Sequence, residues 1–387
     1  MDSRALIEEI RSLYGPGPVL LHRPLFQNGE LEHLEACLNS GFVSSAGEMV
    51  TAFERLVAGF AGASFGVATV NGTAALQIAL QVAGVRPGDE VITQPLTFVA
   101  TCNAISHAGA RPVFVDVDED TMGMSPNALK TFLESHAERR NGQCFNRHSG
   151  RRIAACLPMH TLGLMCRIEE IAALCADWSI ALVEDAAEAL GSASGGRHAG
   201  TFGRLGIFSF NGNKIITTGG GGMIITDDAA LAQRARHLTT TAKIPHAYEF
   251  VHDEIGYNYR LPNLNAALGC AQMAHLPEML AAKADVAHRY RAFFAGQNAE
   301  FAAPRQGTTW NHWLCSALLK DLTDRNALLE TLNAEGIQAR PLWTLMGDLP
   351  MYAGCQSDGA RMARFLVERV VSLPSSAPLA GSKGKPA

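Results

Sequence analysis

The chain has 387 residues and a mass of 41.3 kDa, which is enough for one large and one smaller domain. Apolar residues make up 47% and charged residues 18%, which is typical of a compact α/β protein and excludes a largely disordered one. The net charge of −5 provides no polycationic surface, so neither nucleic acid nor an anionic membrane is expected as a partner.

The nine cysteines are scattered, and none forms a Cys-x-x-Cys pair. This pattern favours free thiols and predicts neither a disulfide framework nor a metal site. The first ten residues are acidic and amphipathic, unlike a signal peptide, and no apolar run reaches the length of a membrane span. We therefore expect a cytoplasmic protein.

The N-terminal pattern predicts three short helices, and from residue 65 apolar β-prone runs alternate with helical segments. This alternation predicts an α/β fold with a mostly parallel central sheet flanked by helices. In such sheets, ligand-binding groups lie on loops at the carboxyl ends of the strands. The polar segment 134–150 is expected to be an exposed loop.

One stretch combines two apolar runs, 207–210 and 223–225, with a turn that carries Lys214 and four consecutive glycines at 219–222. Two buried strands would flank this turn, and desolvation of its lysine favours the neutral amine that can attack a carbonyl group. The alternative is a surface lysine on a β-hairpin.

Beyond this hairpin, the pattern predicts a helix at 228–239 and two helices within 263–295 that break near Pro277. From about residue 311, shorter α and β pieces follow, with a last helix at 357–371. These boundaries predict a large domain with an N-terminal helical arm at 1–260, a smaller C-terminal α+β domain at 261–380 and a disordered tail at 381–387.

Four positions after predicted strands carry groups suited to one cofactor. Gly72 and Thr73 would begin a helix and form an anion pocket, or simply cap that helix. Asp185 follows a buried strand, where it could hold a heterocyclic nitrogen protonated or cap a helix. Ser209 could provide a second hydroxyl group to a phosphate. With Lys214, these residues fit pyridoxal 5′-phosphate (PLP), whose pyridinium ring is an electron sink.

Longer motifs resemble the DegT/StrS-type sugar aminotransferase family of fold-type-I PLP enzymes. The resemblance covers the chain from about residue 41 to residue 376. It rests on the segments 70–76, 88–91, 97–101, 184–191, 208–223 and 256–260. It implies the aspartate-aminotransferase-like fold, in which Lys214 is the Schiff-base lysine and Asp185 the partner of the ring nitrogen.

The resemblance also implies roles for further residues: Gly72, Thr73 and Ser209 as phosphate ligands, and Phe98 as the aromatic that stacks on the ring. Asn258 matches an asparagine that enters the phosphate site of the neighbouring subunit, which implies a homodimer with shared active sites.

Two positions near the expected site keep more than one interpretation. His160 matches a histidine near the cofactor, although a packed structural histidine fits equally well. Glu188 stands where the family often has glutamine or histidine near the ring hydroxyl group, so its protonation state would matter.

Within the family, the chain resembles the bacillosamine and legionaminic-acid branch. This implies transfer of an amino group from L-glutamate to C4 of a UDP-linked 4-keto-6-deoxy-N-acetylhexosamine, for surface-glycan or nonulosonic-acid biosynthesis. A 3-keto sugar or a cyclitol ketone is the alternative, and a non-catalytic regulator is a weaker one. The candidates for contacts with a nucleotide are Arg260, Trp310, His312, Trp313 and Arg340.

Overall fold

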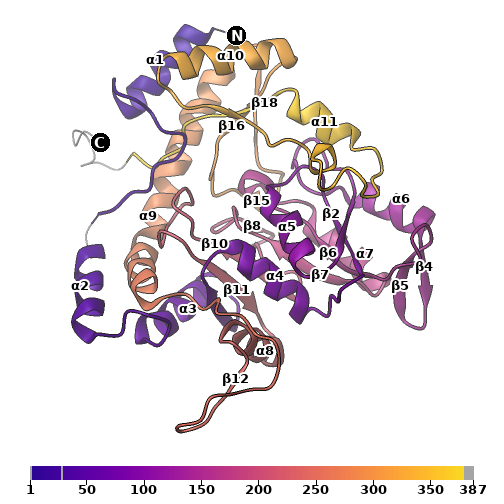
Figure 1. Cartoon of the computed structure of the whole chain (residues 1–387). Helices are drawn as coiled ribbons and strands as arrows, with labels where there is room; N and C mark the ends of the chain where they lie inside the picture. Colours follow the sequence, from indigo (N-terminus) through magenta and orange to yellow (C-terminus); the bar gives the residue numbers. More distant parts are fainter. Residues whose placement is uncertain (1, 28, 379–387) are drawn as a thin grey trace.

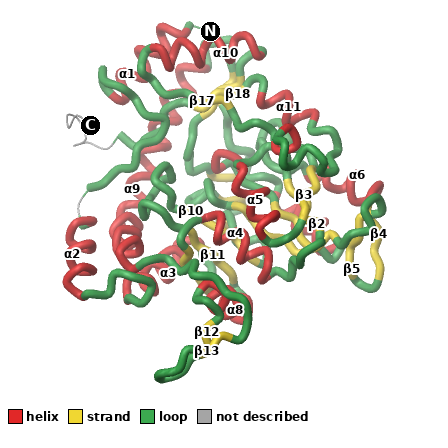
Figure 2. Tube along the Cα trace, in the orientation of Figure 1, coloured by secondary structure: helices red, strands yellow, loops and turns green. Residues whose placement is uncertain are grey.

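The computed structural model describes residues 2–27 and 29–378. Within these residues, no helix is both long and apolar enough to cross a membrane. The predicted tail at 381–387 lies outside the described residues. Figures 1 and 2 show a central sheet with helices around it. A smaller group of elements, which includes α10 and α11, lies near the N-terminus in space.

A seven-stranded sheet in the order β1-β11-β10-β7-β6-β2-β3 forms the centre of the molecule. Its strands are β1 (Phe65–Thr69), β2 (Glu90–Thr93), β3 (Arg111–Phe114), β6 (Ile153–Leu157), β7 (Ala181–Asp185), β10 (Leu205–Ser209) and β11 (Gly222–Thr226). The pairs from β10 to β3 are parallel, whereas β11 runs antiparallel to both β1 and β10. The predicted α/β fold with a mostly parallel sheet is therefore confirmed.

Successive strand residues belong to two different apolar clusters, because neighbouring side chains point to opposite faces of a sheet. In β1, for example, Val67 packs in one cluster and Ala68 in the other, and Ile207 and Phe208 divide in the same way in β10. One face is covered by α4 (Gly72–Val82), α5 (Val99–His107) and α8 (Ala229–Thr239). The other is covered by α3 (Glu48–Ala61), α6 (Pro126–His136), α7 (Ile168–Asp177) and α9 (Asn263–Phe294).

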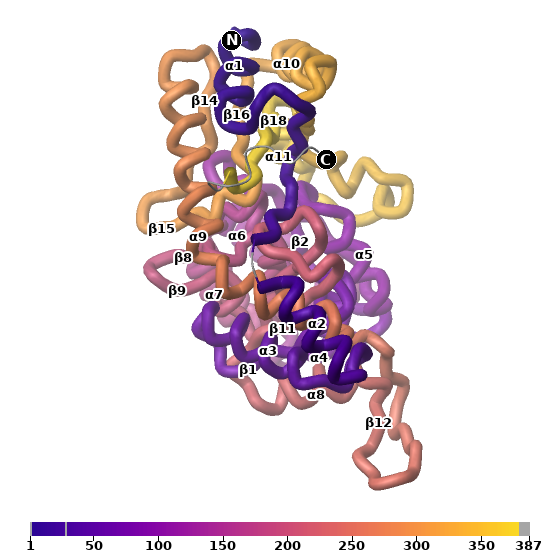
Figure 3. Tube along the Cα trace, turned by 90° about the vertical axis from the view of Figure 1, so that its left-hand side faces the viewer, coloured from indigo at the N-terminus to yellow at the C-terminus, as the bar shows by residue number. Residues whose placement is uncertain are grey.

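A second, four-stranded sheet has the order β14-β16-β18-β17. Its strands are β14 (Glu300–Phe301), β16 (Ser316–Leu318), β17 (Arg340–Pro341) and β18 (Val370–Ser372), with α10 (Leu322–Ala334) and α11 (Arg361–Val367) beside them. The N-terminal helix α1 (Ser3–Tyr14) packs against α10, and Val19 bridges to Ile337 (Figures 1 and 3). The N-terminal arm thus lies with the C-terminal elements, and the predicted domain division after residue 260 remains a prediction.

The predicted break at Pro277 is wrong, because α9 is one continuous helix of 32 residues. The proline removes one backbone donor, but α9 packs against α2 (Glu30–Ser40) and α3 near its start and against β14 near its end. Tertiary packing along its whole length therefore outweighs the local cost of the proline.

Two other local predictions are wrong. Residues 134–150 contain the antiparallel pair β4 (Ala137–Arg140) and β5 (Gln143–Asn146) instead of a plain loop. The last helix, α11, has seven residues and is shorter than predicted. The remaining strands are β8 (Ala193–Ser194), β9 (Arg197–His198), β12 (Lys243–Ile244), β13 (Val251–His252) and β15 (Thr308–Thr309).

Candidate active site

The carboxyl ends of β1, β7 and β10 bring the predicted cofactor residues to one edge of the central sheet. Gly72 and Thr73 begin α4 just after β1, Asp185 is the last residue of β7, and Ser209 is the last residue of β10. Lys214 follows in the turn between β10 and β11. Because these strands point the same way, residues from distant parts of the sequence meet at this edge.

The start of α4 provides a cradle for an anion. A Cβ atom added to Gly72 would lie 3.1 Å from the Cβ atom of Ser209, so glycine allows close approach here. Asn71 caps the helix by accepting from the N–H of Ala74 at 2.8 Å. Among the described residues, the N–H groups of Gly72 and Thr73 and the hydroxyl groups of Thr73 and Ser209 have no hydrogen-bond partner. These donors at a helix N-terminus fit a phosphate group.

Asp185 is 2% exposed, and within residues 2–27 and 29–378 its side-chain hydrogen-bond partners are all neutral. Thr101 donates its hydroxyl group to Oδ2 at 2.7 Å, and the N–H of Ala187 donates to Oδ1 at 3.2 Å. Burial raises the pKa of Asp185, and its hydrogen bond with Thr101 opposes the rise. A buried carboxyl group of this kind fits a ligand that brings a positive charge.

The Lys214 side chain lies inside the protein and is 13% exposed. Its Nζ atom lies 3.5 Å from Oε1 of Glu188 and 4.0 Å from the ring centre of Trp313. This geometry contradicts the alternative of a surface lysine on a hairpin. A small pocket joins these groups, and its lining residues are Ala187, Glu188, Leu190, Ser209, Lys214, Ile215, Ile216, Asn311 and Trp313.

Glu188 lies on the loop after β7, three residues beyond Asp185. One carboxylate oxygen faces Lys214, and the other accepts the N–H of Leu162 at 2.9 Å. Burial raises the pKa of Glu188 to about 7, although the nearby Lys214 opposes this effect. Glu188 can therefore accept or release a proton near neutral pH.

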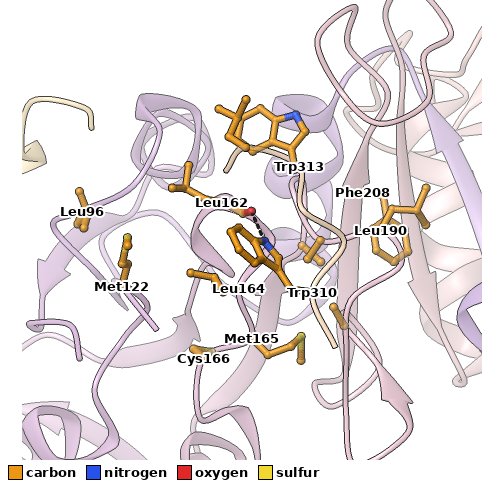
Figure 4. Close-up of a cluster of buried hydrophobic side chains, with 14 of the residues drawn as sticks. Leu96, Met122, Leu162, Leu164, Met165, Cys166, Leu190, Phe208, Trp310 and Trp313 are labelled. Atoms are coloured by element: carbon orange, nitrogen blue, oxygen red, sulfur yellow. Dashed lines mark hydrogen bonds between the residues drawn. The ribbon is translucent and has the colours of Figure 1, made fainter. Parts of the chain in front are cut away.

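The sequence interpretation missed the wall of this pocket. After β15 pairs with β8, the chain places Trp313 in the lining of the pocket. Figure 4 shows Trp310 and Trp313 among buried apolar side chains, with the Trp310 indole bonded to the carbonyl of Leu162. Asn311 is buried between them, and its Nδ2 atom donates to the backbone carbonyls of Glu188 at 2.7 Å and Leu190 at 3.0 Å. The only available signal was the composition Trp-Asn-His-Trp at 310–313. It does not indicate which distant segment these side chains contact.

His160 makes a different contact from the expected one. Its Nε2 atom lies 3.0 Å from Glu184, the residue before Asp185, and its Nδ1 atom lies 3.6 Å from the sulfur of Cys166. Burial alone would lower the pKa of His160, but Cys166 and Glu184 raise it to about 10. Adjacent strand residues face opposite ways, so this geometry supports the interpretation of His160 as a packed structural histidine.

Phe98 and Asn258 lie outside the pocket. Phe98 precedes α5 and is 48% exposed, with its ring 6.3 Å from that of Trp343. Asn258 is exposed and forms a backbone bridge with Thr240. Neither residue contacts Lys214 within this chain, so their roles toward a cofactor remain predictions.

Three of the five nucleotide-contact candidates, Trp310, His312 and Trp313, lie together after β15, whereas Arg260 and Arg340 lie elsewhere. Trp310 and Trp313 are buried, and Arg260 pairs with Glu54 at 3.3 Å. Burial lowers the pKa of His312 to about 4. Arg340 is exposed and bonds to a neighbouring side chain. The nucleotide contacts of these residues therefore remain predictions.

One group of possible metal ligands, His237, Asp253 and Glu254, occurs among the described residues. His237 pairs with Asp253 at 2.7 Å, and Glu254 pairs with Arg234. Arg234 already pairs with Glu254, and His237 already bonds to Asp253, so the arrangement is explained as a surface network of polar contacts.

The fold and the site together define a class of protein. A mostly parallel α/β sheet carries an anion cradle, a buried carboxyl group and a pocket lysine at one edge. This is the arrangement of a PLP-dependent enzyme of fold type I.

Comparisons with known proteins narrow this class. EpsN of Bacillus subtilis (strain 168), named provisionally a pyridoxal phosphate-dependent aminotransferase, is 35% identical over 92% of this chain and 90% of its own. The GDP-perosamine synthase of Vibrio cholerae is 32% identical over 92% and 93%. A UDP-N-acetyl-3-dehydro-alpha-D-glucosamine 3-aminotransferase of Acidithiobacillus ferrooxidans (strain ATCC 23270) is 32% identical over 85% and 84%.

Solved structures of aminotransferases also resemble this chain. The aminotransferase TlmJ of Streptoalloteichus hindustanus superposes with a TM-score of 0.85 at 27% identity and covers 95% of both chains. DesI, determined with its TDP-sugar product, gives a TM-score of 0.81 at 28% identity over 94% of this chain and 89% of its own. The model of the DegT/DnrJ/EryC1/StrS aminotransferase family matches residues 25–384, and the chain belongs to that family. It is therefore a PLP-dependent aminotransferase.

Proposed function

We propose that this enzyme moves an amino group from L-glutamate to the C4 keto group of a nucleotide-linked 4-keto-6-deoxy sugar. The preferred substrate is a UDP-4-keto-6-deoxy-N-acetylhexosamine, and the amino sugar would enter surface-glycan or nonulosonic-acid biosynthesis. The observation that carries the aminotransferase assignment is the position of Lys214 between Glu188 and Trp313, beside the anion cradle of Gly72, Thr73 and Ser209.

Each group of the site has a proposed role toward PLP. The free donors of Gly72, Thr73 and Ser209 would hold the phosphate, and Asp185 would hold the ring nitrogen. When bound, PLP supplies an electron sink for the electrons released as the α-C–H bond of the amino donor breaks. The resemblance adds Phe98 as the ring stacker and Glu188 as the residue near the ring hydroxyl group.

The side chains of the site would manage the protons of the reaction. Lys214 would form the covalent bond to the cofactor and, once displaced by the donor, its Nζ atom would take up and return the donor's α-proton. Glu188, 3.5 Å away and with a pKa of about 7, can exchange a proton with Lys214. Asp185 keeps a proton on the ring nitrogen, and Trp313 excludes water from one side of Lys214.

We also propose a homodimer in which Asn258 completes the partner's phosphate site. The β12–β13 hairpin supports this proposal because it projects from the body of the molecule (Figures 1 and 3). Tyr248 at 80% exposed, Phe250 at 79% and Ile255 at 86% lie on or beside it. Large apolar side chains gathered in this way are typical of protein–protein contacts.

All nine cysteines are unpaired, which supports a reducing, cytoplasmic location.

A 3-keto sugar is the second candidate substrate, supported by the relative from Acidithiobacillus ferrooxidans, whose name specifies 3-amination of a UDP-linked sugar. The names of the other relatives and structures include GDP and TDP sugars, so the nucleotide has to be tested together with the position of the keto group. A cyclitol ketone remains a further alternative. The buried Lys214 pocket argues against a non-catalytic regulator.

The test is an absorbance spectrum of the purified protein with PLP, recorded before and after addition of L-glutamate. We expect a band at the edge of the visible region that shifts with glutamate and is absent in Lys214→Ala. The matched control is Lys130→Ala, which removes a 60% exposed lysine of α6 and should leave the spectrum unchanged. A colourless wild-type protein in the presence of PLP would refute the function.

The glutamate-treated enzyme is then offered UDP-, GDP- and TDP-linked 4-keto-6-deoxy sugars and a UDP-linked 3-keto sugar. Return of the original band identifies the amino acceptor, and competition by free UDP separates nucleotide-sugar recognition from recognition of a free cyclitol. Return of the band only with the 3-keto sugar would replace the C4 assignment.

A further inference from the structure

A second lysine, Lys283, is buried on α9 outside the pocket already described and is 1% exposed. Among the described residues no carboxylate pairs with it; its Nζ atom donates to the backbone carbonyls of Trp313, at 3.2 Å, and Ser375. Burial lowers the pKa of Lys283 to about 7. An apolar side chain of the same length would avoid this desolvation cost, so the two carbonyl contacts require an explanation.

The contact with Trp313 leads directly to the active site. The Trp313 indole donates its Nε1–H to the carbonyl of Asn213 at 2.7 Å, and its ring centre lies 4.0 Å from Nζ of Lys214. The N–H of Trp313 donates to Oδ1 of Asn311 at 3.0 Å. Trp313 therefore connects Lys283, which binds its main chain, with Lys214, which its side chain covers.

Further hydrogen bonds fix the segment whose carbonyl Lys283 binds at Ser375. Tyr290, two turns further along α9, donates its hydroxyl group to the carbonyl of Pro374 at 2.9 Å, next to the carbonyl that Lys283 binds. Ser375 in turn accepts the N–H of Cys315 at 2.8 Å. A lysine amine has two hydrogens even when neutral, so it can hold both carbonyls in either charge state.

We propose that Lys283 is a positioning residue of the active site: its hydrogen bond to the Trp313 carbonyl holds the indole over Lys214 and keeps the Lys214 amine away from water. This inference rests on the proposed role of Lys214 as the reactive lysine. The helix α9 thereby contributes to the site through a residue that does not itself contact the pocket.

The test is trace acetylation of the cofactor-free protein with acetic anhydride, measured by peptide mass spectrometry as the ratio of modified Lys214 to modified Lys130. Lys130 is exposed and serves as the internal standard. Lys283→Met keeps the apolar stem but removes the donor, and Trp313→Leu removes the indole itself. We expect each variant to raise the ratio several-fold.

The double variant distinguishes positioning from a general loss of structure. If Lys283 acts through Trp313, Lys283→Met adds nothing to the ratio already reached in Trp313→Leu. An unchanged ratio in folded Lys283→Met, or a fully additive increase in the double variant, would overturn the proposal. If Lys283→Met does not fold, Lys283→Gln takes its place, because its amide is polar but one bond too short to reach the Trp313 carbonyl, and its ratio must lie above that of the wild type.

A parallel sample separates this inference from the proposed function. Borohydride reduction in the presence of PLP should leave the cofactor on the Lys214 peptide. Absence of that adduct would refute the role of Lys214, whereas the acetylation ratios report on Lys283 and Trp313 whether or not PLP binds.

Discussion

Two buried carboxyl groups near Lys214 differ in what faces them. Asp185 is bonded to a hydroxyl group and a backbone N–H, whereas Glu188 faces the Lys214 amine itself. Asp185 thus has no cationic partner among the described residues until a ligand supplies one, whereas Glu188 already has an amine of the chain 3.5 Å away. The two acids can therefore serve a ring nitrogen and an amine separately.

Asp185→Asn should separate stability from activity. Asparagine still accepts the Thr101 hydroxyl group but does not bring a negative charge into the buried site. We expect the cofactor-free variant to melt at an equal or higher temperature than the wild type. We also expect the transamination rate to fall by about 100-fold or more, because the charge that holds the ring nitrogen protonated is lost. A rate near that of the wild type would remove Asp185 from its proposed role.

Glu188→Gln should change how stability depends on pH. The folded protein holds the Glu188 proton up to a pKa of about 7, against an ordinary value of 4.5, so its stabilising effect is complete below pH 4.5 and is lost as the pH rises through 7. Glutamine stays neutral throughout. The unfolding free energy of the variant, relative to the wild type, should rise by up to about 3 kcal/mol between these pH values.

Urea unfolding of the cofactor-free proteins at several pH values measures this difference. The conservative variant Glu188→Asp keeps a titrating group and is the control, since it should retain a pH dependence of the same sign. Parallel curves for the wild type and Glu188→Gln would show that Glu188 titrates normally.

At the scale of elements, the prediction succeeded where local pattern and burial agree. The runs that became β6, β7 and β10 are mainly apolar and almost entirely buried, as parallel strands covered on both faces are. The β4–β5 hairpin was missed because its strands are largely polar and half exposed. In α9, packing against other elements outweighed Pro277, which a local pattern cannot predict.

Some residues of the site could likewise be predicted from the local sequence, and others could not. Gly72, Asp185 and Ser209 were predictable because each lies at, or just beyond, the carboxyl end of a strand of one sheet. Asn311 and Trp313 were not, because their partners lie about a hundred residues earlier in the chain, and only the β15–β8 pairing brings the two segments together.

The packing of α3 on α9 can be tested at two helical glycines, one inside the helix contact and one outside it. A Cβ atom at Gly269 of α9 would lie 2.6 Å from the Phe53 ring and 2.8 Å from Cγ2 of Thr218, on the Lys214 loop. We expect Gly269→Ala to lower the unfolding free energy by about 1–3 kcal/mol. At Gly59 of α3 nothing lies within 4 Å, so Gly59→Ala should raise it by about 0.5–1 kcal/mol. Chemical denaturation measures both, and equal effects would refute this account of the helix contact.

At the scale of the whole molecule, the proposed shared sites predict complementation between inactive variants. Lys214→Ala and Asn258→Ala each disable the site by a different residue. If Asn258 serves the partner's site, a heterodimer of the two variants has one intact site. Random exchange of subunits should then restore roughly a quarter of the wild-type activity, since half of the dimers are mixed and half of their sites are intact.

Activity is measured after mixing the variants under conditions that allow subunit exchange, and each variant alone is the control. No recovery in a sample that native mass spectrometry shows to contain mixed dimers would place Asn258 in its own chain's site, and full activity of Asn258→Ala alone would place it outside any site.

The attachment of Trp313 has a consequence for how the protein is made. Its indole covers a lysine at position 214, while its main-chain carbonyl is bound by Lys283 of α9, whose amine also binds the carbonyl of Ser375. On a ribosome, the sheet that carries Lys214 emerges long before these segments do. A chain still under synthesis would leave the Lys214 amine, which we propose as the reactive group, uncovered until α9 and residue 375 had also emerged.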